Sequence, residues 1–453
     1  MSNFLTRTAI LLTIFTGVAH STATAQTVQD NFHKYADALT LDISKKDGVF
    51  AKGEEITVYA TSEVDTTATV RILRDAHFPE GSYNVKLQKG RKTGIFTKTY
   101  DRPIHIMLQV GSEDGKDSDQ AGFIVAPEEF RTGYSHPKDF RKFWNRQKKA
   151  MRKTRLEYSL TPAQFADTSN AEKYECFDLK INMHEGRPVR GYMVYPKNTK
   201  KGSLPIVIRL HSAGVNRVFN YATPEYALSC ARYGSGCIAI DINAHGLETG
   251  QPQSYYDRFD RGELRNYSNR FITGHGDYYF RLMFLRIVRT LDFACGLDLW
   301  DGKRVLVTGE SQGGAQAFAV SGLDRRVTAC VAIVPAMNDL GAKYDGRYGC
   351  WPKVLESSVN KGNEDTVNNI LPYYDAAQFV KYSKAIFCVE AGLIDTTCPA
   401  AAVWAGINNI PGEKTVLSYF HRAHNNPVKS SRYRKDWEKI NEARNSWIND
   451  YLK

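Results

Sequence analysis

The sequence predicts an α/β protein in which an open, doubly wound and mostly parallel sheet follows a small all-β sandwich. Between Gln26 and about Ala126, apolar and polar residues alternate with a period of two, which is typical of half-buried strands. From about Pro137 onward, continuous apolar runs alternate with helical patterns, as in a parallel sheet that helices cover on both faces. We therefore expect four segments, which are residues 1–25, 26–126, 127–136 and 137–453.

The first 25 residues are predicted to be a secretory signal peptide. Arg7 precedes an apolar run at 8–19, and Ala23-Thr24-Ala25 has the small-x-small pattern of a cleavage site,. The run is too short to cross a bilayer comfortably, and no later stretch approaches about 20 apolar residues. We expect a secreted or periplasmic protein with no membrane span after cleavage; retention of the segment as an N-terminal anchor is the alternative.

Charge and cysteine spacing narrow the function classes. The formal net charge is +11, and much of it lies in 138–155 and 429–439. Apolar residues recur there at helical intervals, which indicates two solvated helix faces rather than a nucleic-acid site. None of the eight cysteines has C-x-x-C spacing, so a zinc ribbon or a thioredoxin site is not expected. Cys330 and Cys388 fall in apolar runs, where buried free thiols are expected.

The segment 26–126 is expected to be an immunoglobulin-like sandwich. Turn residues such as Asp47-Gly48 separate its alternating segments,. The predicted strands are 39–43, 55–59, 68–72 and 104–108. The segment holds no catalytic constellation, so we expect it to serve packing, spacing or assembly, with carbohydrate binding as the alternative.

After the 127–136 linker, an amphipathic helix is predicted to begin at Phe140, and a strand pair to turn at Glu185-Gly186. Right-handed crossovers then place reactive groups beyond the carboxyl ends of the parallel strands. The pair comprises 176–181 and 190–195, and the core strands are predicted at 204–210, 237–242, 304–308, 329–334, 385–391 and 415–420.

Gly309-Glu310-Ser311-Gln312-Gly313 has the pattern of a nucleophile elbow between a strand and a helix,. The turn is so tight that the positions two before and two after the serine must lack bulk, and both are glycine. Ser311 is the predicted nucleophile, and the backbone N–H of Gln312 is a predicted oxyanion donor. The alternative is a glycine-rich turn whose serine caps the helix.

The groups that activate a serine follow other strands. The hydroxyl needs an imidazole to accept its proton, and the imidazole needs a carboxylate to hold its tautomer. Asp395 follows the strand at 385–391, and His424 follows the strand at 415–420. The order Ser, Asp, His is that of α/β-hydrolases. Ala213, directly after the first core strand, is the predicted second oxyanion donor.

Two alternatives compete with these assignments. Asp339 follows the strand at 329–334, which some hydrolases use for the acid; we favour Asp395. His421 competes with His424, but it lies at the last turn of its strand, whereas His424 has the freedom of a loop.

With these residues assembled, the chain from about His136 to its C-terminus resembles the acetyl xylan esterase and cephalosporin C deacetylase family, which is carbohydrate esterase family seven. The matching blocks are Pro-x-Asp-Phe-x-x-Phe-Trp at 137–144, Tyr-Tyr-Phe-Arg at 278–281, Gly-x-Ser-Gln-Gly-Gly at 309–314, Gly-Leu-x-Asp-x-x-Cys-Pro at 392–399 and Asn-Asn-Ile at 408–410. The block around Asp395 is the most specific.

The resemblance implies an α/β-hydrolase fold, a triad of Ser311, Asp395 and His424, and oxyanion donors at Ala213 and Gln312. It implies removal of acetyl groups from xylan or its oligosaccharides without a metal or cofactor. The family commonly forms hexamers, so a homo-oligomer is expected, although the added sandwich could obstruct it. The family's Arg-Gly-Gln-Gly segment is Asn-Ala-His-Gly at 243–246 here, and the Glu after its catalytic histidine is Asn425; both departures bear on specificity.

The segment 339–374 is long enough to cap the site. Its aromatic residues are Tyr344, Tyr348, Trp351, Tyr373 and Tyr374, which either stack on sugar rings or form the core of the cap. Tyr348 and Trp351, together with His245, are the candidate substrate contacts. The alternatives to an acetyl esterase are a peptidase, an esterase for larger acyl groups, and a non-catalytic carbohydrate-binding protein on a hydrolase scaffold.

Overall fold

The computed structural model describes residues 38–115, 117–270, 272–425 and 431–453. The predicted signal peptide therefore lies outside the described residues. Among those residues, no helix is both long and apolar enough to cross a membrane.

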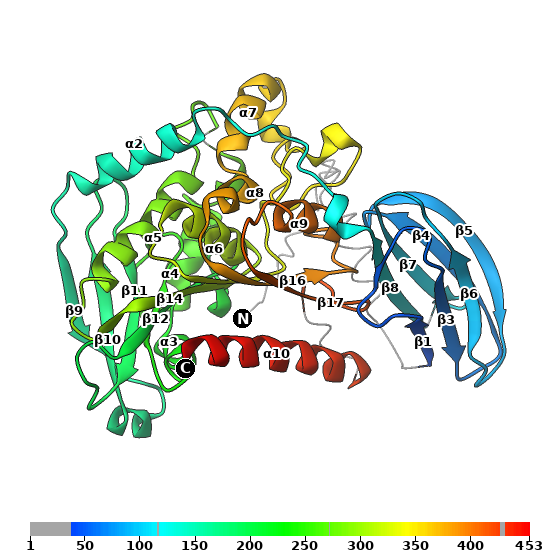
Figure 1. Cartoon of the computed structure of the whole chain (residues 1–453), viewed down its shortest axis with the longest axis horizontal. Helices are drawn as coiled ribbons and strands as arrows, with labels where there is room; N and C mark the ends of the chain where they lie inside the picture. Colours follow the sequence, from blue (N-terminus) through cyan, green and yellow to red (C-terminus); the bar gives the residue numbers. More distant parts are fainter. Residues whose placement is uncertain (1–37, 116, 271, 426–430) are drawn as a thin grey trace, which may run out of the picture.

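The N-terminal part is a sandwich of two sheets that share one apolar core (Figure 1). In the segments 39–43 and 56–62, fully buried residues alternate with half-buried ones, as the period of two predicts, whereas 104–110 is buried continuously,. In spatial order, one sheet contains β1 (Leu39–Ile43), β3 (Ile56–Ser62) and β6 (Thr93–Lys98), and the other contains β2 (Val49–Phe50), β8 (Ser118–Val125), β7 (Ile104–Ser112), β4 (Thr66–Arg74) and β5 (Phe78–Leu87). All four predicted strands are present.

The larger part is built on a nine-stranded sheet. Its spatial order is β17 (Lys414–Tyr419), β16 (Ile386–Gly392), β15 (Ala329–Ile333), β14 (Trp300–Glu310), β12 (Leu204–Leu210), β13 (Ile238–Ile242), β11 (Val189–Pro196), β10 (Tyr174–Ile181) and β9 (Tyr158–Pro162). The strands from β17 to β13 are parallel, and β11, β10 and β9 are antiparallel. The mostly parallel α/β sheet is confirmed. The sequence analysis did not predict β9, a largely exposed edge strand.

Helices cover both faces of this sheet. One face packs on α2 (Phe140–Arg152), α5 (Phe280–Ala294), α6 (Gln312–Leu323), α8 (Ala376–Phe379) and α9 (Ala400–Ile407), and the other packs on α3 (Pro224–Ala231) and α10 (Ser431–Leu452). Two further helices, α4 (Gln253–Arg261) and α7 (Glu364–Ile370), lie in the connections. The basic stretch 138–155 falls largely on α2, which buries Phe140, Phe143 and Trp144 and exposes most of its lysines and arginines.

The sandwich packs beside the β16 and β17 end of the large sheet (Figure 1). Phe420, which directly follows β17, belongs to the sandwich core. Its N–H donates to the carbonyl of Lys46, and its own carbonyl accepts the N–H of Gly122 at 2.8 Å. Between the last strand and His424, the chain therefore packs against the sandwich.

Candidate active site

Ser311 lies between the end of β14 and the start of α6, with φ 56° and ψ −118°. A side chain in this conformation is strained, as expected for a nucleophile elbow. A Cβ atom on Gly309 would lie 2.5 Å from the carbonyl carbon of Gly313, and a Cβ atom on Gly313 would lie 2.3 Å from the carbonyl oxygen of Leu210. Both glycines are therefore required by close backbone approach.

The structure brings Ser311, His424 and Asp395 together. His424 Nε2 lies 2.9 Å from Ser311 Oγ, and His424 Nδ1 lies 2.7 Å from Asp395 Oδ2. A carboxylate accepts, so Nδ1 carries the proton and Nε2 is left to accept the proton of the serine. The other oxygen of Asp395 accepts the N–H groups of Thr397 and Cys398 at 2.8 and 2.7 Å.

The electrostatic surroundings favour proton acceptance by His424. Burial lowers the pKa of this imidazole, but the charge and hydrogen bond of Asp395 outweigh burial, and Glu310 adds to them. The net result is a raised pKa. A more basic imidazole is a stronger general base for the serine hydroxyl.

Arg422 supports the backbone of the same loop. Its Nε and Nη2 atoms lie 3.2 and 3.1 Å from Glu390 Oε2, and its Nη1 donates to the carbonyl of His424 at 3.2 Å. No motif in the sequence marks this buried ion pair. An acidic residue inside the apolar strand β16 was the available signal.

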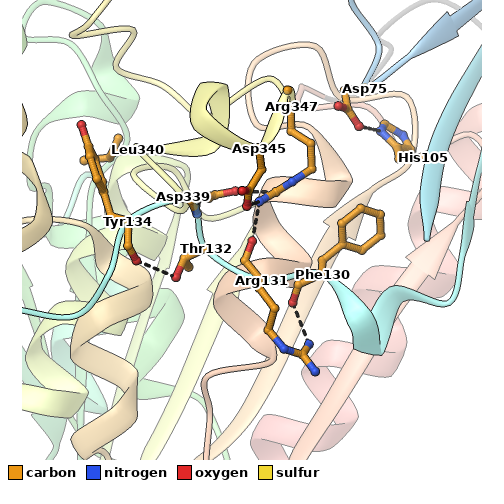
Figure 2. Close-up of polar contacts among 12 residues, drawn as sticks. Asp75, His105, Phe130, Arg131, Thr132, Tyr134, Asp339, Leu340, Asp345 and Arg347 are labelled. Atoms are coloured by element: carbon orange, nitrogen blue, oxygen red, sulfur yellow. Dashed lines mark hydrogen bonds and ion pairs between the residues drawn. The ribbon is translucent and has the colours of Figure 1, made fainter. Parts of the chain in front are cut away.

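The alternative acid and base lie elsewhere. Asp339 accepts the N–H of Gly133 at 2.7 Å and forms an ion pair with Arg347 (Figure 2). The ring of His421 lies against that of Phe420 at a tilt of 36°, with the centroids 3.6 Å apart. The carboxylate that contacts His424 is that of Asp395.

Tyr267 connects the two predicted oxyanion donors. Its hydroxyl donates to Gln312 Oε1 at 2.5 Å and accepts the N–H of Gly214 at 3.3 Å. Gln312 is the first residue of α6, so its own N–H has no partner within the helix. The carbonyl of Ala213 accepts from Asn220 Nδ2 at 2.8 Å, which holds the neighbouring peptide. No motif marked Tyr267 in the sequence.

His245 lies behind this loop. Its Nε2 atom lies 3.0 Å from the carbonyl of Gly214, its Nδ1 atom lies 2.8 Å from the hydroxyl of Tyr279, and the side chain is buried. Asn243, in the same segment, accepts the N–H of Ala222 and donates to the carbonyl of Leu247. The departure at 243–246 therefore places a histidine against the loop that carries Ala213, the predicted oxyanion donor.

A cavity of about 920 Å³ opens over Ser311. Trp351 lines it and donates its backbone N–H to the carbonyl of Thr397 at 3.0 Å. Other residues of the lining include Ala213, Phe219, Glu310, Arg422, His424 and Asn425. Of the three candidate substrate contacts, only Trp351 is part of the lining.

The other aromatic residues of the cap make protein contacts. Tyr348 stacks on His77 of the sandwich with the ring centroids 3.6 Å apart, and Tyr374 is fully buried. Tyr373 donates its hydroxyl to Asp139, and Tyr344 is 52% exposed. For most of these side chains the structure favours a role in the cap itself.

Asp395, Cys398 and His424 offer ligand atoms that lie within 4.8 Å of one another. Both nitrogens of His424 and both oxygens of Asp395 already have protein partners. The spacing therefore follows from the hydrogen-bonded relay. All eight cysteines are free thiols, and Cys330 and Cys388 are buried as expected.

Comparison with known proteins finds relatives of this chain. Residues 127–438 match the family model described as acetyl xylan esterase. The acetyl esterase Axe7A of Xylanibacter ruminicola is 28% identical over 414 residues, which cover 89% of this chain and 91% of that protein.

Two solved structures share the fold of the larger part. The acetyl xylan esterase of Paenibacillus sp. R4 aligns with a TM-score of 0.57 and 23% identity over 70% of this chain and 98% of its own. Acetyl xylan esterase 1 of Thermoanaerobacterium sp. aligns with a TM-score of 0.54 and 22% identity over 70% and 97%.

Proposed function

The chain belongs to the acetyl xylan esterase family and is a carboxylic ester hydrolase, and we propose that it removes acetyl groups from acetylated xylan or xylo-oligosaccharides through an acyl-enzyme on Ser311. The observation that carries the proposal is the hydrogen-bonded series from Ser311 Oγ through His424 to Asp395, at 2.9 and 2.7 Å, beneath an open cavity.

In the first half-reaction, Ser311 Oγ attacks the acetyl carbonyl carbon and His424 Nε2 takes the hydroxyl proton. The carbonyl oxygen becomes an oxyanion, which the N–H groups of Ala213 and Gln312 stabilise. The bond to the sugar oxygen then breaks, and His424 returns its proton to that leaving oxygen. The products are the free sugar hydroxyl and acetyl-Ser311.

In the second half-reaction, a water molecule replaces the sugar hydroxyl. His424 removes a proton from this water as the water attacks the acetyl carbonyl, and it then protonates Ser311 Oγ as the acyl bond breaks. Acetate leaves and the serine is restored. Throughout both steps, Asp395 holds His424 in one tautomer and stabilises the imidazolium.

The lining of the cavity supports a carbohydrate ester as substrate. Trp351 offers an aromatic face, and Glu310 and Asn425 offer polar groups for hydroxyls,. The predicted leader at residues 1–25 supports export to the compartment where such polymers are found.

The test is acetate release from acetylated xylo-oligosaccharides, with 4-nitrophenyl acetate and 4-nitrophenyl butyrate as comparison substrates. Ser311→Ala is expected to lower kcat by roughly 10⁴-fold or more on both acetyl substrates. The matched control is Ser321→Ala, in the same helix. The hydroxyl that it removes donates to the carbonyl of Phe318.

Efficient turnover of the butyrate ester would favour an esterase for larger acyl groups, and cleavage of peptides would favour a peptidase. Absence of turnover by the wild-type protein on every ester would favour the carbohydrate-binding alternative. Undiminished turnover by Ser311→Ala would overturn the assignment of the nucleophile.

A further inference from the structure

Two histidines of the sandwich contact the loop that carries Asp395. His105, in β7, places Nε2 2.9 Å from the carbonyl oxygen of Leu393, and His77, after β4, places Nε2 2.7 Å from the carbonyl oxygen of Thr396. A carbonyl oxygen only accepts, so each Nε2 carries a proton and donates it. The two bonds flank Asp395 on both sides along the chain.

The hydrogen bond from His77 to Thr396 acts on a peptide that contacts Asp395 directly. The carbonyl of Thr396 and the N–H of Thr397 belong to one rigid peptide plane. That N–H donates to Asp395 Oδ1 at 2.8 Å. His77 therefore sets the orientation of a donor to the predicted catalytic carboxylate.

The hydrogen bond from His105 to Leu393 acts on the loop that carries His424. The carbonyl of Leu393 shares a peptide plane with the N–H of Ile394, and this N–H donates to the carbonyl of Arg422 at 3.1 Å. Arg422 in turn donates to the carbonyl of His424. His105 therefore fixes the contact between the two loops that supply the acid and the base.

The approach of the sandwich to these loops is very close. A Cβ atom on Gly122 of β8 would lie 1.9 Å from the carbonyl oxygen of Leu393, so a larger residue would displace the loop. The N–H of the same glycine donates to the carbonyl of Phe420. The sandwich is thus held against both loops by backbone contacts as well as by the two imidazoles.

The sandwich is also attached to the cap, which in turn contacts the 127–136 linker. Arg74 Nη1 donates to the carbonyl of Gly346 at 2.8 Å. Next to it, Arg347 is paired with Asp339 and Asp345 and donates to the carbonyl of Arg131, in a cluster that lies beside Asp75 and His105 (Figure 2). These contacts hold the sandwich in one orientation relative to the cap.

Both imidazoles are neutral donors at neutral pH. Burial lowers the pKa of His77 to about 4; Lys353 and His105 also lower it, whereas the bond to Thr396 and the charge of Asp395 oppose the shift. Burial likewise lowers the pKa of His105, against the charges of Asp75 and Asp395 and the bond to Leu393. The two bonds therefore persist at the pH where esterases of this kind use a neutral general base.

We propose that His77 and His105 are positioning residues of the esterase, which hold Asp395 and the His424 loop through the carbonyls of Thr396 and Leu393. On this basis the sandwich contributes to catalysis by positioning the loops of the active site. The inference rests on the proposed roles of Ser311, Asp395 and His424.

The test compares variants that keep or remove the donor in the full-length protein. His77→Phe keeps a ring against Tyr348 but has no donor, whereas the amide nitrogen of His77→Gln keeps a donor near Nε2. His105→Leu and His105→Gln make the same comparison at the buried position. His275→Phe is the matched control, because His275 also contacts a backbone carbonyl, that of Asn369, away from the loop of Asp395.

With 4-nitrophenyl acetate, His77→Phe and His105→Leu are each expected to lower kcat about 10-fold with KM little changed, because a displaced acid misaligns the base. Asp395 raises the pKa of His424, so a weakened contact moves the acidic limb of the kcat/KM profile to lower pH. The Gln variants are expected to recover most of kcat and the wild-type limb. His275→Phe is expected to match the wild type in both.

Two results would overturn the proposal. One is wild-type kcat and an unshifted acidic limb in both His77→Phe and His105→Leu. The other is a Gln variant that melts like the wild type yet is as impaired as its donor-free counterpart. Ser311→Ala in the same assay separates this inference from the proposed function. If Ser311→Ala is inactive while the histidine variants keep wild-type activity, the positioning role alone is rejected. If Ser311→Ala turns over ester as fast as the wild type, Ser311 is rejected as the nucleophile.

Discussion

The hydroxyl of Tyr267 lies 2.5 Å from Oε1 of Gln312, and so ties the start of α6 to the loop after β12. One hydroxyl thereby connects the two elements that supply the predicted oxyanion donors, because it also accepts the N–H of Gly214. The ring is buried, with its edge against His245.

Tyr267→Phe is expected to lower kcat for 4-nitrophenyl acetate about 10-fold while KM changes little, since the donors are displaced but the cavity is kept. The variant leaves a half-buried N–H and a buried amide oxygen without this partner, so the free energy of unfolding should fall by about 1–3 kcal/mol. Steady-state kinetics and urea denaturation measure both effects. Unchanged kcat in a destabilised variant would mean that the hydroxyl serves stability alone.

Asp395→Asn is expected to lower kcat by roughly 10⁴-fold, because an amide in this place favours the wrong tautomer of His424. The matched control is Asp339→Asn, which alters a buried carboxylate paired with Arg347 and is expected to lower the melting temperature while leaving kcat unchanged. Kinetics and thermal denaturation of both variants check this pair. The reverse pattern would reassign the acid to Asp339.

Gly313→Ala is expected to destabilise the protein by about 1–3 kcal/mol or more, because its Cβ would overlap the backbone of β12. The added strain also displaces Ser311, so esterase activity should fall. Gly276→Ala is the control, since a Cβ there meets no atom within 4 Å. Equal melting temperatures for the two variants would contradict the close approach at the elbow.

His245 predicts a pH dependence of stability. Burial lowers its pKa in the folded protein to about 3, with Arg286, Arg187 and His211 adding and the bond to Gly214 opposing. An unfolded chain protonates this ring near its ordinary value of about 6.5. The unfolded state therefore gains protons as the pH falls below that value, and stability is lost over this range.

Relative to His245→Gln, the wild type should lose at most about 2 kcal/mol of unfolding free energy between pH 7 and pH 5. Urea denaturation at the two pH values measures this difference. Parallel pH dependence in the two proteins would show that His245 is not held neutral by the fold.

The sequence predicted the central sheet and the order of Ser311, Asp395 and His424 because strand patterns and strand ends are local signals. The approach of His424 to Asp395 followed from the rule that carboxyl ends of parallel strands meet at one edge. The edge strand β9 was not predicted although its five residues, Tyr-Ser-Leu-Thr-Pro at 158–162, alternate between apolar and polar. The segment is short and ends in a proline, which weakens a strand pattern.

Local sequence patterns could not predict the contacts of His77, His105 and Tyr348. These contacts depend on how the sandwich docks on the larger part, and no period or motif encodes that arrangement. Tyr348 was read as a sugar-stacking candidate because an aromatic residue in a cap has the same local pattern whether it faces a ligand or a neighbouring domain.

The hydrogen bonds from His105 to Leu393 and from His77 to Thr396 span 288 and 319 positions of the chain. A ribosome releases the sandwich long before it releases the loops that the sandwich holds, and domains generally fold as units in that order. The sandwich is thus already made when the loops that it holds emerge. Hydrolysis of an ester by this protein would accordingly report that the sandwich and these two loops, far apart in the chain, have docked.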